Sequence, residues 1–80
     1  LVRLKSRLIG TKGKARKIIE RLSGCYVSVY GRSVSIIGEH ERLNVAFRAV
    51  EKLLRGSPHG HVYAYLERDM RKLRDNYLKN

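Results

Sequence analysis

The spacing of apolar residues changes twice along this 80-residue chain, and the change restricts the folds that it can adopt. Up to residue 23 apolar residues recur at helical spacing, over 25–37 they alternate with polar ones, and from residue 39 helical spacing returns. Gly31-Arg32 divides the alternating stretch, which predicts two strands, 25–30 and 33–37, joined by a tight turn. Because an isolated hairpin is only marginally stable, we expect an α+β fold in which helices cover one face of the hairpin.

Four helices are expected around this hairpin. They cover residues 1–9, 14–23, 39–55 and 58–78. Gly24 and Gly56 act as helix stops, and Ser57-Pro58 is typical of a helix start. The apolar stripe of the third helix contains Leu43, Ala46, Phe47, Val50, Leu53 and Leu54, and that of the fourth contains Val62, Leu66, Met70, Leu73 and Tyr77. So small a chain can hardly leave the second stripe exposed, so we expect the fourth helix to pack on the domain.

The length and the residue types exclude several classes of protein. The chain is long enough for one hydrophobic core and too short for two. No apolar run approaches the length of a membrane helix, and no leader-like segment opens the chain, so we expect neither a membrane span nor a signal peptide. Cys25 is the single cysteine, which favours a reducing, cytoplasmic environment. Its position on the inward side of the first strand predicts a small core residue rather than a nucleophile.

The strongest indication of function is the charge. The formal net charge is +11, from 18 Lys and Arg against 7 Asp and Glu. Between residues 3 and 21 there are eight basic residues and one acidic residue, Glu20. Such a concentration usually accompanies a polyanionic partner, and nucleic acid is the best fit. An anionic membrane surface and an ordinary solvated helix face are the alternatives.

The segment Gly10-Thr11-Lys12-Gly13 lies between two predicted helices and in the middle of the basic stretch. Two glycines three residues apart let the backbone approach a bulky anion. The following helix offers unpaired N–H groups and the positive end of its dipole, which together suit a phosphate. An ordinary helix–turn–helix corner would also explain the glycines, but not the basic residues around them.

This loop, its two flanking helices, the hairpin and the long helix after it resemble a type I KH domain, whose mark is a GxxG loop preceded by aliphatic residues. The resemblance implies a single-stranded RNA-binding module in which Gly10, Thr11, Lys12 and Gly13 hold the sugar-phosphate backbone. Arg7, Lys14, Arg16 and Lys17 surround this loop and Arg32 stands at the hairpin turn, so we expect these cations to neutralise phosphates. The aliphatic residues that the resemblance assigns to a base groove are Ile9, Ile18 and Val27. A type I KH domain also opens with a strand, and we find none before the first helix, which would leave the sheet with an exposed edge.

A narrower resemblance rests on Ala15-Arg16, Ile18-Ile19-Glu20, 26–31, 36–38, Pro58-His59, Val62-Tyr63 and Leu66-Glu67. These segments are similar to the second KH domain of archaeal small-ribosomal-subunit assembly proteins of the partner-of-Nob type. The resemblance implies residues 1–57 as the KH core and 58–80 as an added C-terminal helix. It also implies binding to small-subunit rRNA near its 3′ end, and contact with the alpha subunit of a translation initiation factor.

Neither catalysis nor a bound metal is expected. His59 and His61 are two residues apart, which does not place both on one helix face, and no further ligand stands nearby. The acidic residues are scattered along helices, and no nucleophile motif is present, so we expect a protein without enzymatic activity or cofactor. A protein-interaction module with a degenerate KH surface, acting through its last helix, remains the alternative function. Binding of single-stranded DNA also stays open, since no residue evidently reads the 2′-hydroxyl.

Overall fold

The computed structural model describes residues 13–31 and 33–79 of the chain. The elements are α2 (Lys14–Ser23), β1 (Tyr26–Tyr30), β2 (Ser33–Ile37), α3 (His40–Leu54) and α4 (His59–Lys79). Their order and type confirm the predicted α+β succession. The helix expected at 1–9 lies outside the described residues. None of the described helices is long and apolar enough to cross a bilayer.

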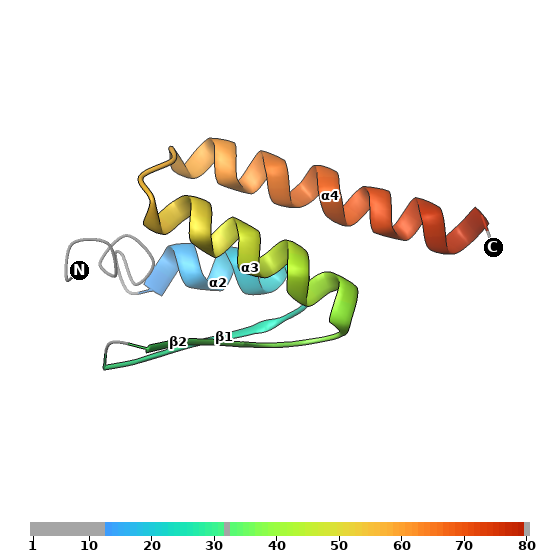
Figure 1. Cartoon of the computed structure of the whole chain (residues 1–80). Coiled ribbons are helices and arrows are strands. Elements are labelled where there is room, and N and C mark those ends of the chain that lie inside the picture. The colour runs from blue at the N-terminus through green and yellow to red at the C-terminus, as the bar shows by residue number, and fades with distance from the viewer. Residues whose placement is uncertain (1–12, 32, 80) are drawn as a thin grey trace.

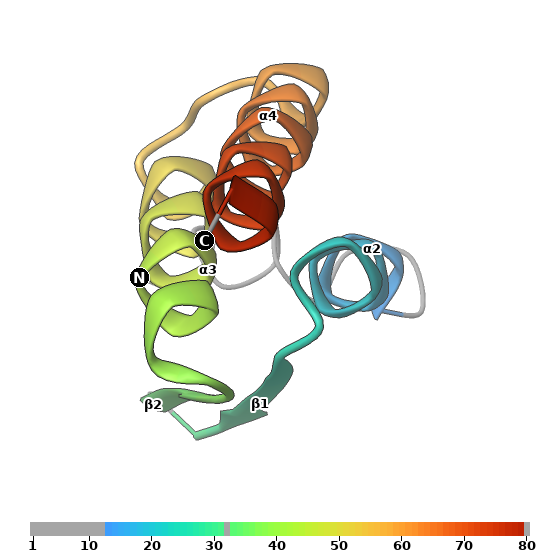
Figure 2. The same ribbon diagram turned by 90° about the vertical axis from the view of Figure 1, so that its right-hand side faces the viewer.

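The elements form three layers (Figure 1). The hairpin lies at one side, α2 and α3 lie against one of its faces, and α4 packs on both helices from the side away from the sheet. Seen along the helices, α2 lies over β1 and α3 over β2 (Figure 2). The short connection after α3 turns the chain back, so α3 and α4 run in opposite directions.

The hairpin pairs β1 and β2 antiparallel, with Val27 opposite Ile36 and Val29 opposite Val34. These four side chains face the helices, as the alternation predicts. The other face carries Tyr26 and Tyr30, which are 74% and 85% exposed. The hairpin therefore has one packed and one open face.

Two glycines stand at the ends of the hairpin, where the chain needs an unusual backbone conformation or a close contact. Gly24 ends α2 in the left-handed conformation (φ 72°) and donates its N–H to the Glu20 carbonyl at 2.9 Å. Gly38, directly after β2, lies so close to Cys25 that a Cβ added there would collide with the Cys25 Sγ. The Cys25 thiol is buried at this contact, in agreement with its predicted place in the core.

The core forms where α2, α3, α4 and β1 meet. Its buried members are Ala15, Ile19, Val27, Val45, Ala49, Val50, Leu53, Val62 and Leu66. Val62 and Leu66 come from the predicted stripe of the last helix, and both are fully buried. Burial of an aliphatic side chain of this size contributes about 1.5–3 kcal/mol, so α4 is part of what holds the domain together.

The predicted stripe of α3 is wrong at Phe47, which is 57% exposed. Val45 and Ala49, outside that stripe, are buried instead. The reason is that α3 is covered from two sides, by β2 and by α4, so its buried surface is turned toward α4. Phe47 then lies at the outer border of the sheet side.

Candidate nucleic-acid interface

The start of α2 is the part of the predicted site that the structure describes. Gly13 precedes the helix in the left-handed conformation, with φ 71° and ψ 26°. Such a φ is strained for residues with a side chain, which explains a glycine at this position. No acidic residue occurs in the first turn of α2, so nothing there offsets the positive end of the helix dipole.

Cations line the exposed side of this helix. Lys14, Lys17 and Arg21 follow one another at helical spacing and are all exposed. None of the three forms an ion pair with another residue in the described part of the chain. Arg21 was not among the predicted site residues, although its spacing from Lys14 and Lys17 already placed it on their face.

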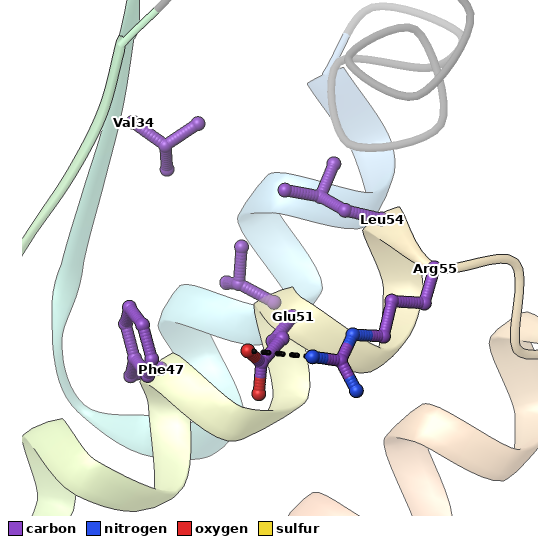
Figure 3. Close-up of a pocket in the computed structure, with 6 residues that line it drawn as sticks. Val34, Phe47, Glu51, Leu54 and Arg55 are labelled. Atoms are coloured by element: carbon purple, nitrogen blue, oxygen red, sulfur yellow. Dashed lines mark hydrogen bonds and ion pairs between the residues drawn. The ribbon is translucent and has the colours of Figure 1, made fainter. Parts of the chain in front are cut away.

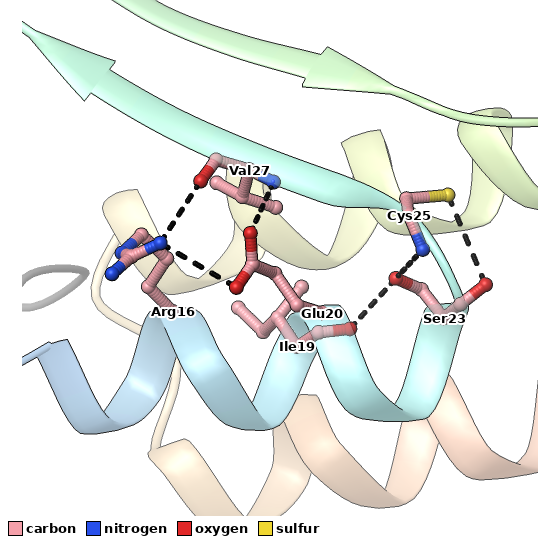
Figure 4. A network of polar contacts seen from close by, with 6 residues as sticks. All are labelled: Arg16, Ile19, Glu20, Ser23, Cys25 and Val27. Carbon is pink, nitrogen blue, oxygen red and sulfur yellow. Dashed lines mark hydrogen bonds and ion pairs between the residues drawn. The ribbon is translucent and has the colours of Figure 1, made fainter.

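Arg16 is held differently from these cations (Figure 4). Its Nη1 donates to the Val27 carbonyl at 3.3 Å and lies 3.4 Å from the Glu20 Oε1. Its Nη2 is the side-chain atom nearest to Gly13, 3.5 Å from where a Cβ on that glycine would stand. The guanidinium therefore lies near Gly13 and is bonded to β1, and the Arg16 side chain remains 33% exposed.

The Glu20 carboxylate completes this contact. Its Oε2 accepts a hydrogen bond from the Val27 N–H at 2.7 Å. Both backbone polar groups of Val27 are thus bonded to side chains of α2, at the edge of β1 that does not pair with β2. Next to it, Ser23 accepts from the Cys25 N–H at 3.1 Å and donates to the Ile19 carbonyl at 2.7 Å, which ties the end of α2 to the same strand.

The aliphatic residues predicted for a base groove differ in exposure. Ile18 is half-buried on α2, whereas Val27 is 2% exposed and belongs to the core. The structure therefore leaves surface for a base at Ile18 but none at the Val27 side chain. The remaining predicted residues lie outside the described part of the chain: Arg7, Ile9, Gly10, Thr11, Lys12 and Arg32.

A hollow lies on the sheet side of α3 (Figure 3). Val34, Phe47, Val50 and Leu54 line it, and the Glu51–Arg55 ion pair of 3.3 Å stands at its rim. Among the described residues β2 pairs only with β1, and its other edge lies beside this hollow. The exposed sheet edge expected from the sequence depends on residues 1–12, which lie outside the described part of the chain.

No metal site is formed among residues 13–31 and 33–79, because no group of three or more potential metal ligands comes together there. His59 packs edge-on against the Tyr63 ring, with centroids 6.1 Å apart, at the start of α4. Burial raises the pKa of the Tyr63 hydroxyl above its usual value.

Comparison with known proteins identifies the family. The family model described as "Eukaryotic type KH-domain (KH-domain type I)", for the second KH domain of Pno1, matches residues 1–71. The chain belongs to this KH family. The match covers the GTKG segment, α2, the hairpin, α3 and α4 as far as Arg71, which confirms both resemblances noted in the sequence.

Curated relatives of this KH domain come from archaea and fungi. A KH domain-containing protein of Methanocaldococcus jannaschii is 53% identical over 72 residues, which is 90% of this chain and 32% of the relative. The pre-rRNA-processing protein pno1 of Aspergillus fumigatus is 32% identical over 77 residues, which is 96% of this chain and 31% of the relative. The chain thus spans about a third of the length of the curated relatives it matches.

Solved structures share the fold. A protein of unknown function from Aeropyrum pernix is 44% identical, with a TM-score of 0.93, over 99% of this chain and 42% of that one. The Pyrococcus horikoshii complex of a/eIF2alpha, aDim2p and rRNA contains a chain 54% identical, with a TM-score of 0.84, over 90% of this chain and 41% of that one. Free Dim2p from the same organism is 57% identical, with a TM-score of 0.81, over 85% of this chain and 41% of that one.

Proposed function

We propose that this KH domain binds single-stranded RNA through the GTKG loop and the start of α2, and that the RNA is small-subunit rRNA during ribosome assembly. The observation that carries the proposal is the start of α2. There the left-handed Gly13 opens a helix whose first turn has no acidic residue and whose exposed side carries Lys14 and Lys17. A phosphate at this position gains from the helix dipole, from the N–H groups of the first turn and from the two lysines.

The related proteins support the ribosomal part of the proposal. One relative is named as a pre-rRNA-processing protein, and a solved relative is part of a complex with rRNA. KH domains clamp about four unpaired nucleotides, so the ligand would be an unpaired segment. From the resemblance noted in the sequence, we assign this segment to the 3′ region of the small-subunit rRNA.

Each predicted residue receives a role in this proposal. Gly10 and Gly13 let the RNA backbone approach, while Thr11 and Lys12 between them donate to a phosphate. Cations around the loop neutralise neighbouring phosphates; they are Arg7, Lys14, Lys17 and, at the hairpin turn, Arg32. Ile9 and Ile18 border the bases. Val27 supports the groove from the core, and Arg16 holds β1 beside the loop while keeping part of its guanidinium at the surface.

The test is a fluorescence anisotropy titration of the chain with a short single-stranded RNA at several salt concentrations. Three phosphate contacts predict a log–log salt slope of about −2. The variant Thr11→Asp/Lys12→Asp should abolish binding, and circular dichroism should show unchanged helix content. The charge-matched control is Asn44→Asp/Arg55→Asp, which lowers the net charge by the same three units at two exposed positions of the chain. Equal loss in both variants would mean that the overall charge, rather than the loop, binds the RNA.

A protein-interaction module acting through α4 is less well supported. Val62 and Leu66 of its apolar stripe are fully buried where α4 packs on α2 and α3. To dock on a partner through this stripe, α4 would have to leave the core and lose that burial. The partner suggested by the relatives is instead the initiation factor alpha subunit, since a/eIF2alpha occurs in the complex with aDim2p and rRNA. We propose it as a partner of the longer protein, to be tested by co-purification of the two proteins with and without RNA.

A further inference from the structure

We propose that the seam between α3 and α4 is a second surface that binds an RNA backbone, separate from the GTKG loop. The seam consists of Arg48 and Lys52 on α3 and of Tyr65, Arg68 and Lys72 on α4. It would contact double-stranded RNA that continues from the unpaired segment at the loop. The proposal goes beyond the function proposed above, because that function needs only the loop and α2.

Two cations of the seam face the same aromatic ring. The Lys52 Nζ lies 5.0 Å from the centroid of the Tyr65 ring, and the Arg68 Cζ lies 5.6 Å from it. Each cation is attracted to the negative face of an aromatic ring. The Tyr65 ring thus brings one cation from each helix to the same point of the seam, where each could form a charge-assisted hydrogen bond with an RNA phosphate.

The remaining two cations extend the seam in one direction. Arg48 precedes Lys52 by one helical turn, and Lys72 follows Arg68 by about one turn. Because α3 and α4 run in opposite directions, both residues lie on the same side of Tyr65 along the seam (Figure 1). The result is a row of positive side chains about 6 Å apart along each helix, which suits an extended polyanion rather than a single anion.

The seam keeps its positive charge because the nearby acidic residues are engaged or lie elsewhere. Asp69 lies 3.3 Å from Arg68, and Asp75, three residues after Lys72, lies 3.9 Å from Arg74. Glu51 pairs with Arg55 on the sheet side of α3, and Glu39, Glu41 and Glu67 line a groove next to Leu22 of α2. Arg48, Lys52 and Lys72 are exposed and have no ion pair with another described residue.

The seam and α2 lie on different sides of the domain. Figure 2 shows α3 and α2 on the two sides of α4, so the outer side of the seam between α3 and α4 faces away from α2. A short single strand bound at the loop cannot occupy both faces, whereas a strand that continues into a stem-loop can. We favour RNA over an acidic protein because the proposed function already brings a polyanion to this domain.

The experiment compares two RNAs: a short single strand, and the same strand continued into a stem-loop. The chain should bind the stem-loop RNA more tightly. The variant Arg48→Gln/Lys52→Gln/Lys72→Gln should remove this gain, lower the log–log salt slope for the stem-loop RNA by about 2.7, and leave the short strand unaffected. If the unaltered chain does not bind the short strand, the proposed function at the loop is wrong. If it binds the short strand but gains no affinity from the stem-loop, only the proposal for the seam is wrong.

The control variant is Arg42→Gln/Arg71→Gln/Arg74→Gln, which removes the same charge from the groove on the other flank of α4. It should keep most of the gain from the stem-loop. The proposal is overturned if the chain binds both RNAs equally, or if the two triple variants lose affinity to the same extent. It is also overturned if an acidic polypeptide binds to the seam while the stem-loop does not compete with it.

Discussion

The Glu20 carboxylate accepts a hydrogen bond from the Val27 N–H at 2.7 Å and thereby joins α2 to the edge of β1. With Arg16 bonded to the Val27 carbonyl, a helix closes this edge by side chains where a further strand would close it by backbone. The same contact holds β1 against α2, the helix at whose start we propose RNA to bind. Stability and site geometry therefore depend on one pair of side chains.

The first prediction concerns that pair. Glu20→Ala leaves the Val27 N–H without its partner in a partly buried position, so the free energy of unfolding should fall by about 1–3 kcal/mol. Urea denaturation followed by circular dichroism measures the change. Glu51→Ala is the control, since it breaks the exposed pair with Arg55 and should cost less than about 1 kcal/mol. Equal costs would show that the Glu20 contact is no more than a surface ion pair.

The second prediction separates two neighbouring cations of α2. Lys17 is exposed, so Lys17→Gln should weaken binding to single-stranded RNA while changing the free energy of unfolding by less than about 0.5 kcal/mol. Arg16→Gln should lower stability as well, because it removes the hydrogen bond to Val27 and the contact with Glu20. Paired denaturation and anisotropy experiments distinguish them. If Arg16→Gln reduced affinity without loss of stability, the role assigned here to its guanidinium in holding β1 would be incorrect.

The third prediction compares two glycines in different surroundings, Gly38 and Gly60. Gly38→Ala should cost about 1–3 kcal/mol, since the new Cβ collides with the Cys25 Sγ. Adding Cys25→Ala should recover part of that loss by removing the sulfur. Gly60→Ala, within α4 and with no atom near the new Cβ, should instead stabilise by about 0.5–1 kcal/mol. Thermal unfolding of the four proteins gives the comparison, and a neutral Gly38→Ala would contradict the close contact.

The fourth prediction concerns pH. Burial raises the pKa of Tyr63, so the folded state disfavours the phenolate relative to the unfolded state. The resulting stability is fully present below about pH 10, the ordinary tyrosine value, and is lost as the pH rises through the higher pKa of the folded state. Urea denaturation of the chain and of Tyr63→Phe at alkaline pH should show the smaller decrease for the variant. Tyr26→Phe, at a 74% exposed position, serves as the control; if it flattened the pH dependence as much, Tyr63 would not be the cause.

Much of the fold could be predicted because its signals are local. The bounds of α2, the two-residue turn after Tyr30 and the helix stop at Gly24 all follow from neighbouring residues and their backbone preferences. The GTKG segment could be predicted as a phosphate site for the same reason, since its glycines and the cations around it are close together in the sequence. Val62 and Leu66 were predicted to be buried from their spacing alone, and they are.

The order of the elements, the inward side of each strand and the family of the domain could all be inferred from the residues alone. The packing of the helices was needed to see that Val45 rather than Phe47 is buried, that Arg16 turns back to Val27, and that Lys52 and Arg68 share the Tyr65 ring. These features differ from the first group because they join residues that are far apart along the chain. Periodicity reports which face of a helix is apolar, but which residues at its borders are covered depends on the angle at which remote elements pack.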